Sequence, residues 1–220
     1  MPSADLSLPT SPGGVRIDRV VTSGQFCLDG GCWDVDNNVW IIGNDEECLV
    51  VDCAHEADKI VAGIGGRRVV ALVCTHGHND HVNASDEVKA ATGGQTWLNP
   101  ACRVLWDQSQ TSEPDHELSD GQVFSVGDVE ITALHTPGHA PGATCLSIPS
   151  LRVLLSGDTL FNGGPGATGR SYSDFPTIID SIRDRLLTLP EETIVLTGHG
   201  DATSIGAEKP HLEEWIARGH

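Results

Sequence analysis

The sequence predicts one domain of the α+β class, with an antiparallel β start followed by alternating strands and helices. Its 220 residues and 23.3 kDa are enough to bury a large core without disulfide staples. Apolar residues make up 39% of the chain and charged residues 20%, and no apolar run approaches the roughly 18 residues that a membrane span requires. No repeat, low-complexity segment or linker divides the chain, so a single domain is expected.

The N-terminal residues 1–14, MPSADLSLPTSPGG, have neither the basic start nor the apolar stretch of a secretory signal. They are expected to form a flexible segment before a domain that spans 15–220. Short apolar runs predict the first strands, and the residues 43–47 between the last two favour a hairpin. These strands are expected at 15–21, 38–42 and 48–52.

Helical spacing and short apolar runs then alternate along the chain. Helices are expected at 56–64 and 84–91, on either side of an apolar strand at 69–75. An amphipathic helix at 177–189 lies between Pro176 and Pro190, and a last helix is expected at 207–217. Further strands are expected at 129–134, 143–148, 153–156 and 193–197.

The charge of the chain limits its partners. Thirteen Lys and Arg against 31 Asp and Glu give a formal net charge of -18 and an isoelectric point near 4.7. This is the wrong sign for a surface that binds phosphates, so neither nucleic acid nor an anionic membrane is expected as a partner. A small-molecule substrate is expected instead, and the oligomeric state is left open.

Seven cysteines, an odd number without a disulfide framework, predict reduced thiols and a cytoplasmic protein. Several of them lie in apolar runs that are expected to be strands. Cys27 and Cys32 differ because they flank a Gly-rich turn, where they could pair or bind a metal ion. The sequence leaves their role open.

The segment Thr75-His76-Gly77-His78-Asn79-Asp80-His81 follows a buried apolar run and leads into a helix. Imidazole and carboxylate groups are the usual ligands of zinc and similar divalent ions. His76 and His78, two residues apart in an extended loop, can point to one side, and Asp80 and His81 can serve a neighbouring ion. The pattern H-x-H-x-D-H arises by chance in roughly two random chains per thousand, so a metal site is predicted here.

Three further donors are expected at strand ends: His139 in His-Thr-Pro-Gly-His, Asp158 in Ser-Gly-Asp-Thr and His199 in Thr-Gly-His-Gly. A glycine beside each donor lets the backbone come close to an ion. With these residues the chain resembles the metallo-β-lactamase superfamily, whose signature is H-x-H-x-D-H followed by a His, an Asp and a final His. The resemblance covers nearly the whole chain after its N-terminal segment.

The resemblance implies a fold and a set of ligands. The fold is a four-layer αββα sandwich with a dinuclear site at one edge of the paired sheets. Two divalent ions are the implied cofactors, zinc first, with iron or manganese as alternatives. Of the other histidines, His55, His116, His211 and His220 are interpreted as surface residues, and His135 as a residue that packs beside a ligand. Carried over to this chain, His76, His78 and His139 hold the first ion, Asp80, His81 and His199 hold the second, and Asp158 bridges both.

Two such ions lower the pKa of a shared water from 15.7 towards about 7 and polarise a carbonyl group. The predicted activity is therefore the hydrolysis of an acyl bond by a metal-bound hydroxide. Asp80 and Asp158 are the expected catalytic carboxylates. Asp80 can accept the proton of the attacking water, and a carboxylate held between two cations, as Asp158 would be, stays ionised.

Within the superfamily, residues 156–161 and 169–172 resemble the glyoxalase II branch, the hydroxyacylglutathione hydrolases, in their short single-domain form. In that branch a Gly-Lys-aromatic-Tyr stretch after the bridging Asp holds the thiol carrier. Arg170 stands for the Lys and Tyr172 for the Tyr, and Lys209 is a third expected substrate contact. The expected substrate is therefore a thioester of a low-molecular-weight thiol.

Two other activities stay open. Persulfide dioxygenases, which use one iron ion and oxygen, share the H-x-H-x-D-H motif and a Gly-Arg-Thr-Asp-Phe stretch. Here Gly169-Arg170 and Ser173-Asp174-Phe175 stand for that stretch, with two extra residues between them. Lactonases and β-lactamases share the whole ligand set. A non-enzymatic scaffold is disfavoured, because all seven ligand positions are intact.

Overall fold

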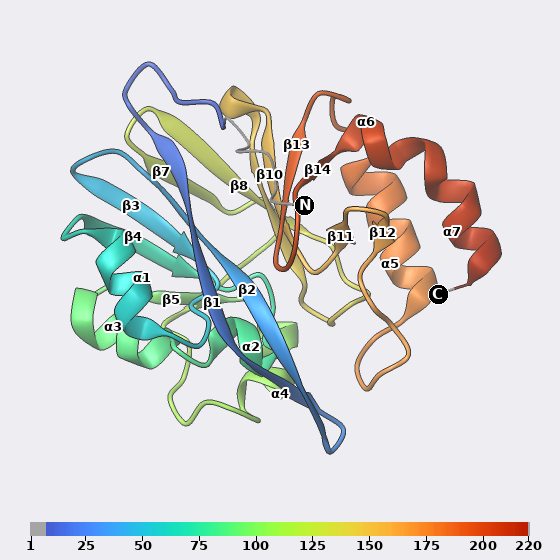
Figure 1. Cartoon of the computed structure of the whole chain (residues 1–220), viewed down its shortest axis with the longest axis horizontal. Coiled ribbons are helices and arrows are strands. Elements are labelled where there is room, and N and C mark those ends of the chain that lie inside the picture. The colour runs from blue at the N-terminus through green and yellow to red at the C-terminus, as the bar shows by residue number, and fades with distance from the viewer. Residues whose placement is uncertain (1–7, 220) are drawn as a thin grey trace.

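Two six-stranded sheets face each other in the computed structural model, which describes residues 8–219 (Figure 1). The first sheet has the strand order β1-β2-β3-β4-β5-β6 and the second the order β14-β13-β10-β9-β8-β7. The first contains β1 (Arg16–Leu28), β2 (Gly31–Gly43), β3 (Glu47–Val51), β4 (Arg68–Val73), β5 (Thr96–Leu98) and β6 (His116–Glu117). The second contains β7 (Val123–Val126), β8 (Val129–His135), β9 (Thr144–Ile148), β10 (Val153–Gly157), β13 (Ile194–Thr197) and β14 (Thr203–Ser204).

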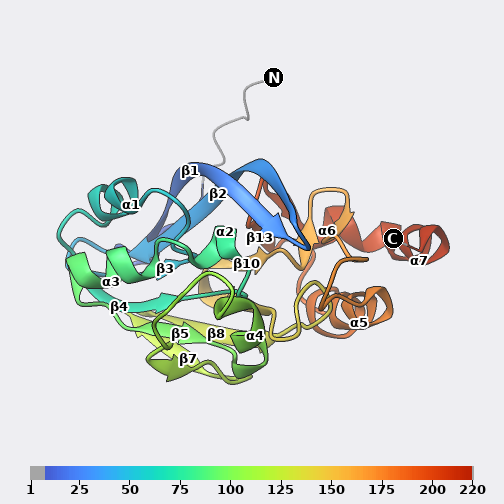
Figure 2. The same ribbon diagram turned by 90° about the horizontal axis from the view of Figure 1, so that it is seen from below.

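The helices lie on the outer faces of the two sheets (Figure 2). On the first sheet these are α1 (Ala57–Ile64) and α3 (Ser85–Thr92). On the second they are α5 (Phe175–Ser181), its π-helical continuation Ile182–Leu186, and α7 (Leu212–Arg218). The shorter elements are α2 (Asn79–Val82), α4 (Arg103–Trp106), α6 (Ile205–Glu208) and the small hairpin of β11 (Leu160–Phe161) and β12 (Gly164–Pro165). The α+β class and the four-layer sandwich expected from the resemblance are confirmed.

Each central strand is buried on both faces, which explains why these strands appear in the sequence as continuous apolar runs. In β2, Trp40 and Ile42 face the core between the sheets, whereas Val39 and Ile41 face the helices. Leu154 of β10 likewise contacts the layer of α5 and α7, while its neighbours in the strand face the other sheet. The period of two along these strands therefore places their apolar residues alternately in the core between the sheets and in the core beneath the helices.

The hairpin of β1 and β2 is much longer than the sequence predicts. The two strands pair from Arg16 with Gly43 out to Leu28 with Gly31, and they turn through Asp29 and Gly30, both of which have positive φ. Their outer halves carry many exposed polar residues, since this two-stranded ribbon extends beyond the rest of the sheet (Figure 1). A polar ribbon lacks the apolar pattern by which a strand is detected, so only its inner half could be predicted.

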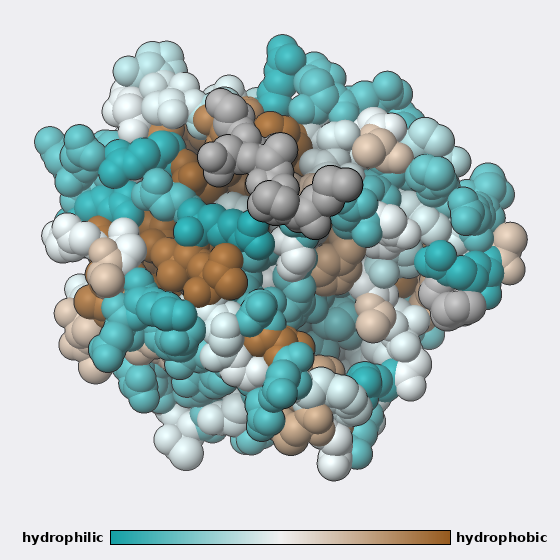
Figure 3. All heavy atoms as spheres, in the orientation of Figure 1, coloured by the Kyte–Doolittle hydropathy of each residue, from teal (hydrophilic) through white to brown (hydrophobic). Residues whose placement is uncertain are grey.

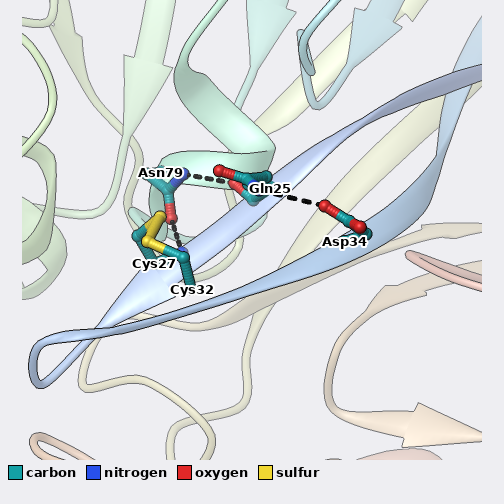
Figure 4. Close-up of a disulfide and its surroundings, with 5 residues drawn as sticks. All are labelled: Gln25, Cys27, Cys32, Asp34 and Asn79. Atoms are coloured by element: carbon teal, nitrogen blue, oxygen red, sulfur yellow. Dashed lines mark hydrogen bonds between the residues drawn. A yellow bond between two sulfur atoms is a disulfide. The ribbon is translucent and has the colours of Figure 1, made fainter.

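Cys27 and Cys32 face each other in this ribbon and form a disulfide (Figure 4). The expectation of reduced thiols is therefore wrong for this pair, and it holds for the five other cysteines, which are free and buried. The Cys27 N–H donates to Asn79 Oδ1 at 2.7 Å, and Asn79 Nδ2 donates to the Gln25 carbonyl at 2.7 Å. These bonds attach the ribbon to α2.

The chain termini are only partly described. Residues 1–7, half of the segment predicted to be flexible, lie outside the described residues. In the other half, the Ser11 hydroxyl and the Gly13 N–H donate to the Asp128 carboxylate, and Leu8 packs against the core between the sheets. The last predicted helix forms two short helices, α6 and α7, around a 3-10 turn that contains Pro210, because proline interrupts the helical hydrogen bonds.

Hydrophilic side chains dominate the face of the molecule shown in Figure 3, with smaller apolar patches between them. Among residues 8–219, no helix combines the length and the apolar character that crossing a bilayer would demand.

The core between the sheets should be sensitive to lost volume. Leu146 in β9 is fully buried there, so Leu146→Ala should lower the free energy of unfolding by about 2–5 kcal/mol, through lost burial and the cavity left behind. Val123→Ala, at a side chain that is 44% exposed in β7, should change it by about 0.5 kcal/mol or less. Denaturant unfolding of both variants measures the difference, and equal losses would contradict the assigned core.

Candidate metal centre

Four of the predicted donors come from one short segment after β4. The Thr75 N–H donates to Asp52 Oδ1 at 2.7 Å, which fixes the chain where it leaves the sheet. His76 and His78 follow in an extended loop, and Asp80 and His81 lie in the single turn of α2. Glycine is required at position 77, between His76 and His78, because a Cβ there would lie 2.7 Å from the Cys102 carbonyl oxygen.

The other three donors come from the second sheet. His139, Asp158 and His199 follow β8, β10 and β13, whose carboxyl ends share one edge of this sheet. Gly198 allows the last two of these strand ends to approach, because a Cβ there would lie 2.2 Å from Asp158 Oδ1. The edges of the two sheets thus place donors from distant parts of the chain around one point.

All seven predicted ligands meet in the structure. They form three overlapping groups whose potential ligand atoms lie within 4.8 Å of one another. The groups are His76, His78 and His139; His76, His81 and Asp158; and Asp80, His81 and His199.

The outer nitrogens of the histidines fix the direction of the inner ones. The Nδ1–H of His139 donates to the Ala167 carbonyl at 2.8 Å, and that of His199 donates to the Asp36 carbonyl at 2.8 Å. His81 Nδ1 donates in the same way to the Asp52 carboxylate at 2.9 Å. Because these acceptors cannot donate, Nδ1 carries the proton in each ring and Nε2 faces the centre.

His76 follows the same rule through a hydroxyl group. Thr75 Oγ1 donates its hydrogen to Asp52 Oδ2 at 2.8 Å, so it must accept from His76 Nδ1 at 3.0 Å. His78 is reversed, since its Nδ1 lies 3.0 Å from His76 Nε2 and 3.1 Å from His139 Nε2. Three ring nitrogens therefore converge, as the ligands of one cation do.

The carboxylates also fit a metal site. Among the described residues, Asp80 Oδ1 and Asp158 Oδ1 are buried oxygen atoms without a hydrogen-bond partner. Buried carboxylate oxygens are costly unless a donor or a cation satisfies them. Imidazole and carboxylate donors in this number suit divalent zinc, iron or manganese.

The two halves of the site differ in charge. Burial lowers the pKa of His76 and His139 and lowers that of His78 to about 3, so these rings are neutral. Burial also opposes a charge on His199, but the carboxylates of Asp158 and Asp80 outweigh it and raise the pKa of His199 to about 10. The proton on His199 occupies a position that a divalent cation can take. Binding of a metal ion at this position would therefore release a proton.

A cavity of about 380 Å³ opens over the donors. Its walls include Phe26 and Trp33 from the β1–β2 ribbon and Arg170 from the loop after β12. The Arg170 guanidinium lies 3.9 Å from the centroid of the Trp33 ring and 5.6 Å from that of Phe26. The Ser171 N–H donates to Asp29 Oδ2 at 3.1 Å, so this loop and the ribbon are joined.

The three expected substrate contacts do not all reach this cavity. Arg170 lines it, whereas Tyr172 is 48% exposed, has a φ of 69° and is not among the lining residues. Lys209 lies 3.7 Å from Glu191 at the surface and is likewise not among them.

Sequence reasoning missed several residues of the site. Asp52 could have been found from the sequence, because it is an acidic residue that directly follows an apolar strand. Phe26, Trp33 and Asn37 could not, since they lie in the polar ribbon. His55 was interpreted as a surface residue, yet it is half-buried and its Nε2 contacts Asn37 Oδ1 at 2.9 Å.

Comparisons with known proteins agree with this geometry. The probable metallo-hydrolase YqgX of Bacillus subtilis is 33% identical over 187 residues, covering 78% of this chain and 89% of that protein. Hydroxyacylglutathione hydrolase GloC of Haemophilus influenzae is 32% identical over 189 residues, again covering 78% and 89%. The crystal structure of TTHA1623 in a di-iron-bound form has a TM-score of 0.72 and 28% identity, over 80% of this chain and 93% of that one.

The family model of the metallo-beta-lactamase superfamily matches residues 33–199, a range that contains all seven donors. With this match and relatives similar over most of their length, the chain belongs to the metallo-beta-lactamase superfamily.

Proposed function

We propose that this protein is a metal-dependent hydrolase that holds two divalent ions and cleaves the thioester of a low-molecular-weight thiol. The position of Asp158 is the observation that supports two ions rather than one. Its Oδ2 lies 3.6 Å from His139 Nε2 and 3.4 Å from His199 Nε2, and its Oδ1 lies 3.4 Å from His81 Nε2. One carboxylate thus reaches donors of both outer groups, as a bridging ligand must.

The proposed assignment follows the three groups of donors. His76, His78 and His139 hold one ion, Asp80, His81 and His199 hold the other, and Asp158 is shared. Zinc is the proposed metal, with iron or manganese as alternatives, and the di-iron form of TTHA1623 supports considering iron. Two divalent ions in such a site supply hydroxide at neutral pH and polarise the carbonyl group of a substrate.

Asp80 is proposed to accept the proton from the attacking water. Although burial raises the pKa of Asp80, the neighbouring imidazoles of His81 and His199 lower it to about 2, so the Asp80 carboxylate stays ionised. Its Oδ1 is buried without a hydrogen-bond partner among the described residues, and Asp80 lines the cavity. An ionised carboxylate in the wall of the cavity supports the role of general base.

The thioester substrate is supported by the leaving group and by Arg170. A thiol with a pKa of roughly 8.5 departs as thiolate and needs no dedicated proton donor. Within the described residues, the Arg170 side chain makes no hydrogen bond or ion pair, although its face stacks on Trp33. Its N–H groups can therefore bind an anionic group of the thiol carrier. The name of GloC, a hydroxyacylglutathione hydrolase, points to the same class of substrate.

The cytoplasm is the proposed compartment, supported by the five free buried cysteines, with the Cys27–Cys32 disulfide as the exception. A small acylated thiol, rather than nucleic acid or a membrane, is the proposed partner, in keeping with the net charge of -18.

Metal analysis of the purified protein, with three assays, tests the activity. We expect two ions per chain and turnover of an acyl-glutathione thioester that exceeds turnover of a lactone. One iron ion per chain with oxygen uptake from a glutathione persulfide would instead identify a persulfide dioxygenase. Faster turnover of the lactone would identify a lactonase.

Removal of the shared carboxylate should affect both ions. Asp158→Ala should abolish activity and reduce the metal content below two ions per chain, because two cations without a bridging anion repel each other. Asp45→Ala removes a carboxylate that is 91% exposed and should change neither quantity. Metal content by elemental analysis decides the outcome, and two retained ions with most of the activity would show that Asp158 is not the bridge.

Removal of Arg170 should weaken substrate binding more than turnover. Arg170→Ala should raise KM for an anionic thioester about 5-fold to 150-fold, which corresponds to about 1–3 kcal/mol for a charge-assisted hydrogen bond, with kcat much less affected. A small neutral thioester should be turned over almost as before. Arg183→Ala, at an exposed arginine paired with Asp180 and Asp184, is the matched control. Equal losses on charged and neutral substrates would assign Arg170 a role in loop structure.

A further inference from the structure

A line of three polar side chains leads from the surface to Asp80, outside the seven donors. Asn37 in β2 is fully buried, and its Nδ2 lies 3.3 Å from Asp80 Oδ2. His55 is half-buried, with its Nε2 2.9 Å from Asn37 Oδ1. Asn83 is exposed, and its Nδ2 lies 2.9 Å from His55 Nδ1.

The carboxylate at the inner end fixes the direction of every hydrogen bond in this line. A carboxylate oxygen only accepts, so Asn37 must present its NH₂ group to Asp80 and its carbonyl oxygen to His55. His55 then donates from Nε2 and accepts at Nδ1 from the Asn83 amide. Burial lowers the pKa of His55, which agrees with a neutral ring that has one donor and one acceptor. The N–H groups of Asn37, His55 and Asn83 thus all donate in the direction of Asp80.

The backbone around His55 is built to hold the imidazole. His55 has a φ of 59°, a left-handed conformation that non-glycine residues seldom adopt. Its N–H donates to Asn83 Oδ1 at 2.6 Å, so Asn83 binds both its backbone and its ring. Gly24 provides the space beside the ring, since a Cβ there would lie 2.2 Å from His55 Nδ1.

We infer that Asn37, supported by His55 and Asn83, is a positioning residue for Asp80. The Asn37 NH₂ group donates to Asp80 Oδ2, the oxygen that lies 3.3 Å from His199 Nε2 and 3.6 Å from His81 Nε2, and thereby holds it beside the other donors of the ion proposed for Asp80, His81 and His199. Outer residues that orient a ligand in this way typically change metal affinity 10-fold to 100-fold when they are removed. The inference rests on the proposed dinuclear site.

The test is the titration of metal-free protein with Zn²⁺ in competition with a chromophoric chelator, which gives the affinity of each ion. Asn37→Leu and His55→Ala should weaken one of the two ions about 10-fold to 100-fold and leave the other near its wild-type affinity. His55→Gln should restore most of the loss, because its amide can still donate to Asn37 Oδ1. His116→Ala, at a histidine that contacts Gln95 and stacks on Trp97, is the control and should bind as the wild type does.

The two histidine variants share the left-handed backbone conformation at residue 55, but alanine also removes side-chain volume. The melting temperature of the metal-free protein is therefore measured for both, because a general loss of stability would weaken both ions rather than one. Equal weakening of both ions, no weakening of either, or a His55→Gln variant as weak as His55→Ala would overturn the inference. Wild-type protein that binds a single Zn²⁺ would show that the dinuclear proposal itself fails, so the two failures are distinguishable.

Discussion

The Asp52 carboxylate connects the fold to the metal centre. It is almost fully buried directly after β3, and it accepts from the Thr75 N–H, the Thr75 hydroxyl and His81 Nδ1. The same hydroxyl accepts from His76, so one carboxylate sets the orientation of two imidazoles and of the loop between them. A buried anion with three charge-assisted or neutral donors is stable where an unpaired one would not be. These hydrogen bonds hold the donor segment in one orientation where β3 and β4 end.

The β1–β2 ribbon serves both the metal side and the substrate side of the site. Its buried inner half supplies Asn37, which contacts Asp80, and its exposed outer half supplies Phe26 and Trp33, which line the cavity. An isolated two-stranded ribbon is marginally stable in water. Here the Cys27–Cys32 disulfide links the two strands of the ribbon to each other. The hydrogen bonds of Asn79 with Gln25 and Cys27, and that of Ser171 with Asp29, attach the ribbon to the rest of the molecule. The cavity thus depends on attachments that lie outside the metal centre.

The cluster of candidate metal ligands could be predicted from the sequence because the motifs that contain them are local. His76, His78, Asp80 and His81 are adjacent, and each of the later donors follows a detectable apolar strand. Asn37 and Trp33 could not be predicted, since their roles come from a fold that pairs a polar ribbon over the site. Tyr172 illustrates the opposite case: it follows the pattern of the glyoxalase II branch, but its positive φ belongs to a turn that leaves the ring exposed. A match to a motif shows that the expected residue type is present, whereas the backbone conformation decides where its side chain points.

The net charge of -18 and the proposed anionic substrate are compatible because the two act over different distances. At an ionic strength of 0.1 M the Debye length is about 10 Å, so exposed carboxylates farther than this from the cavity contribute little to a bound anion. Arg170 lines the cavity and lies against the aromatic face of Trp33, and both side chains are exposed. An ion pair at contact distance outweighs screened repulsion from the distant surface. The acidic surface then affects mainly the rate at which an anionic substrate arrives, whereas Arg170 affects how tightly it binds.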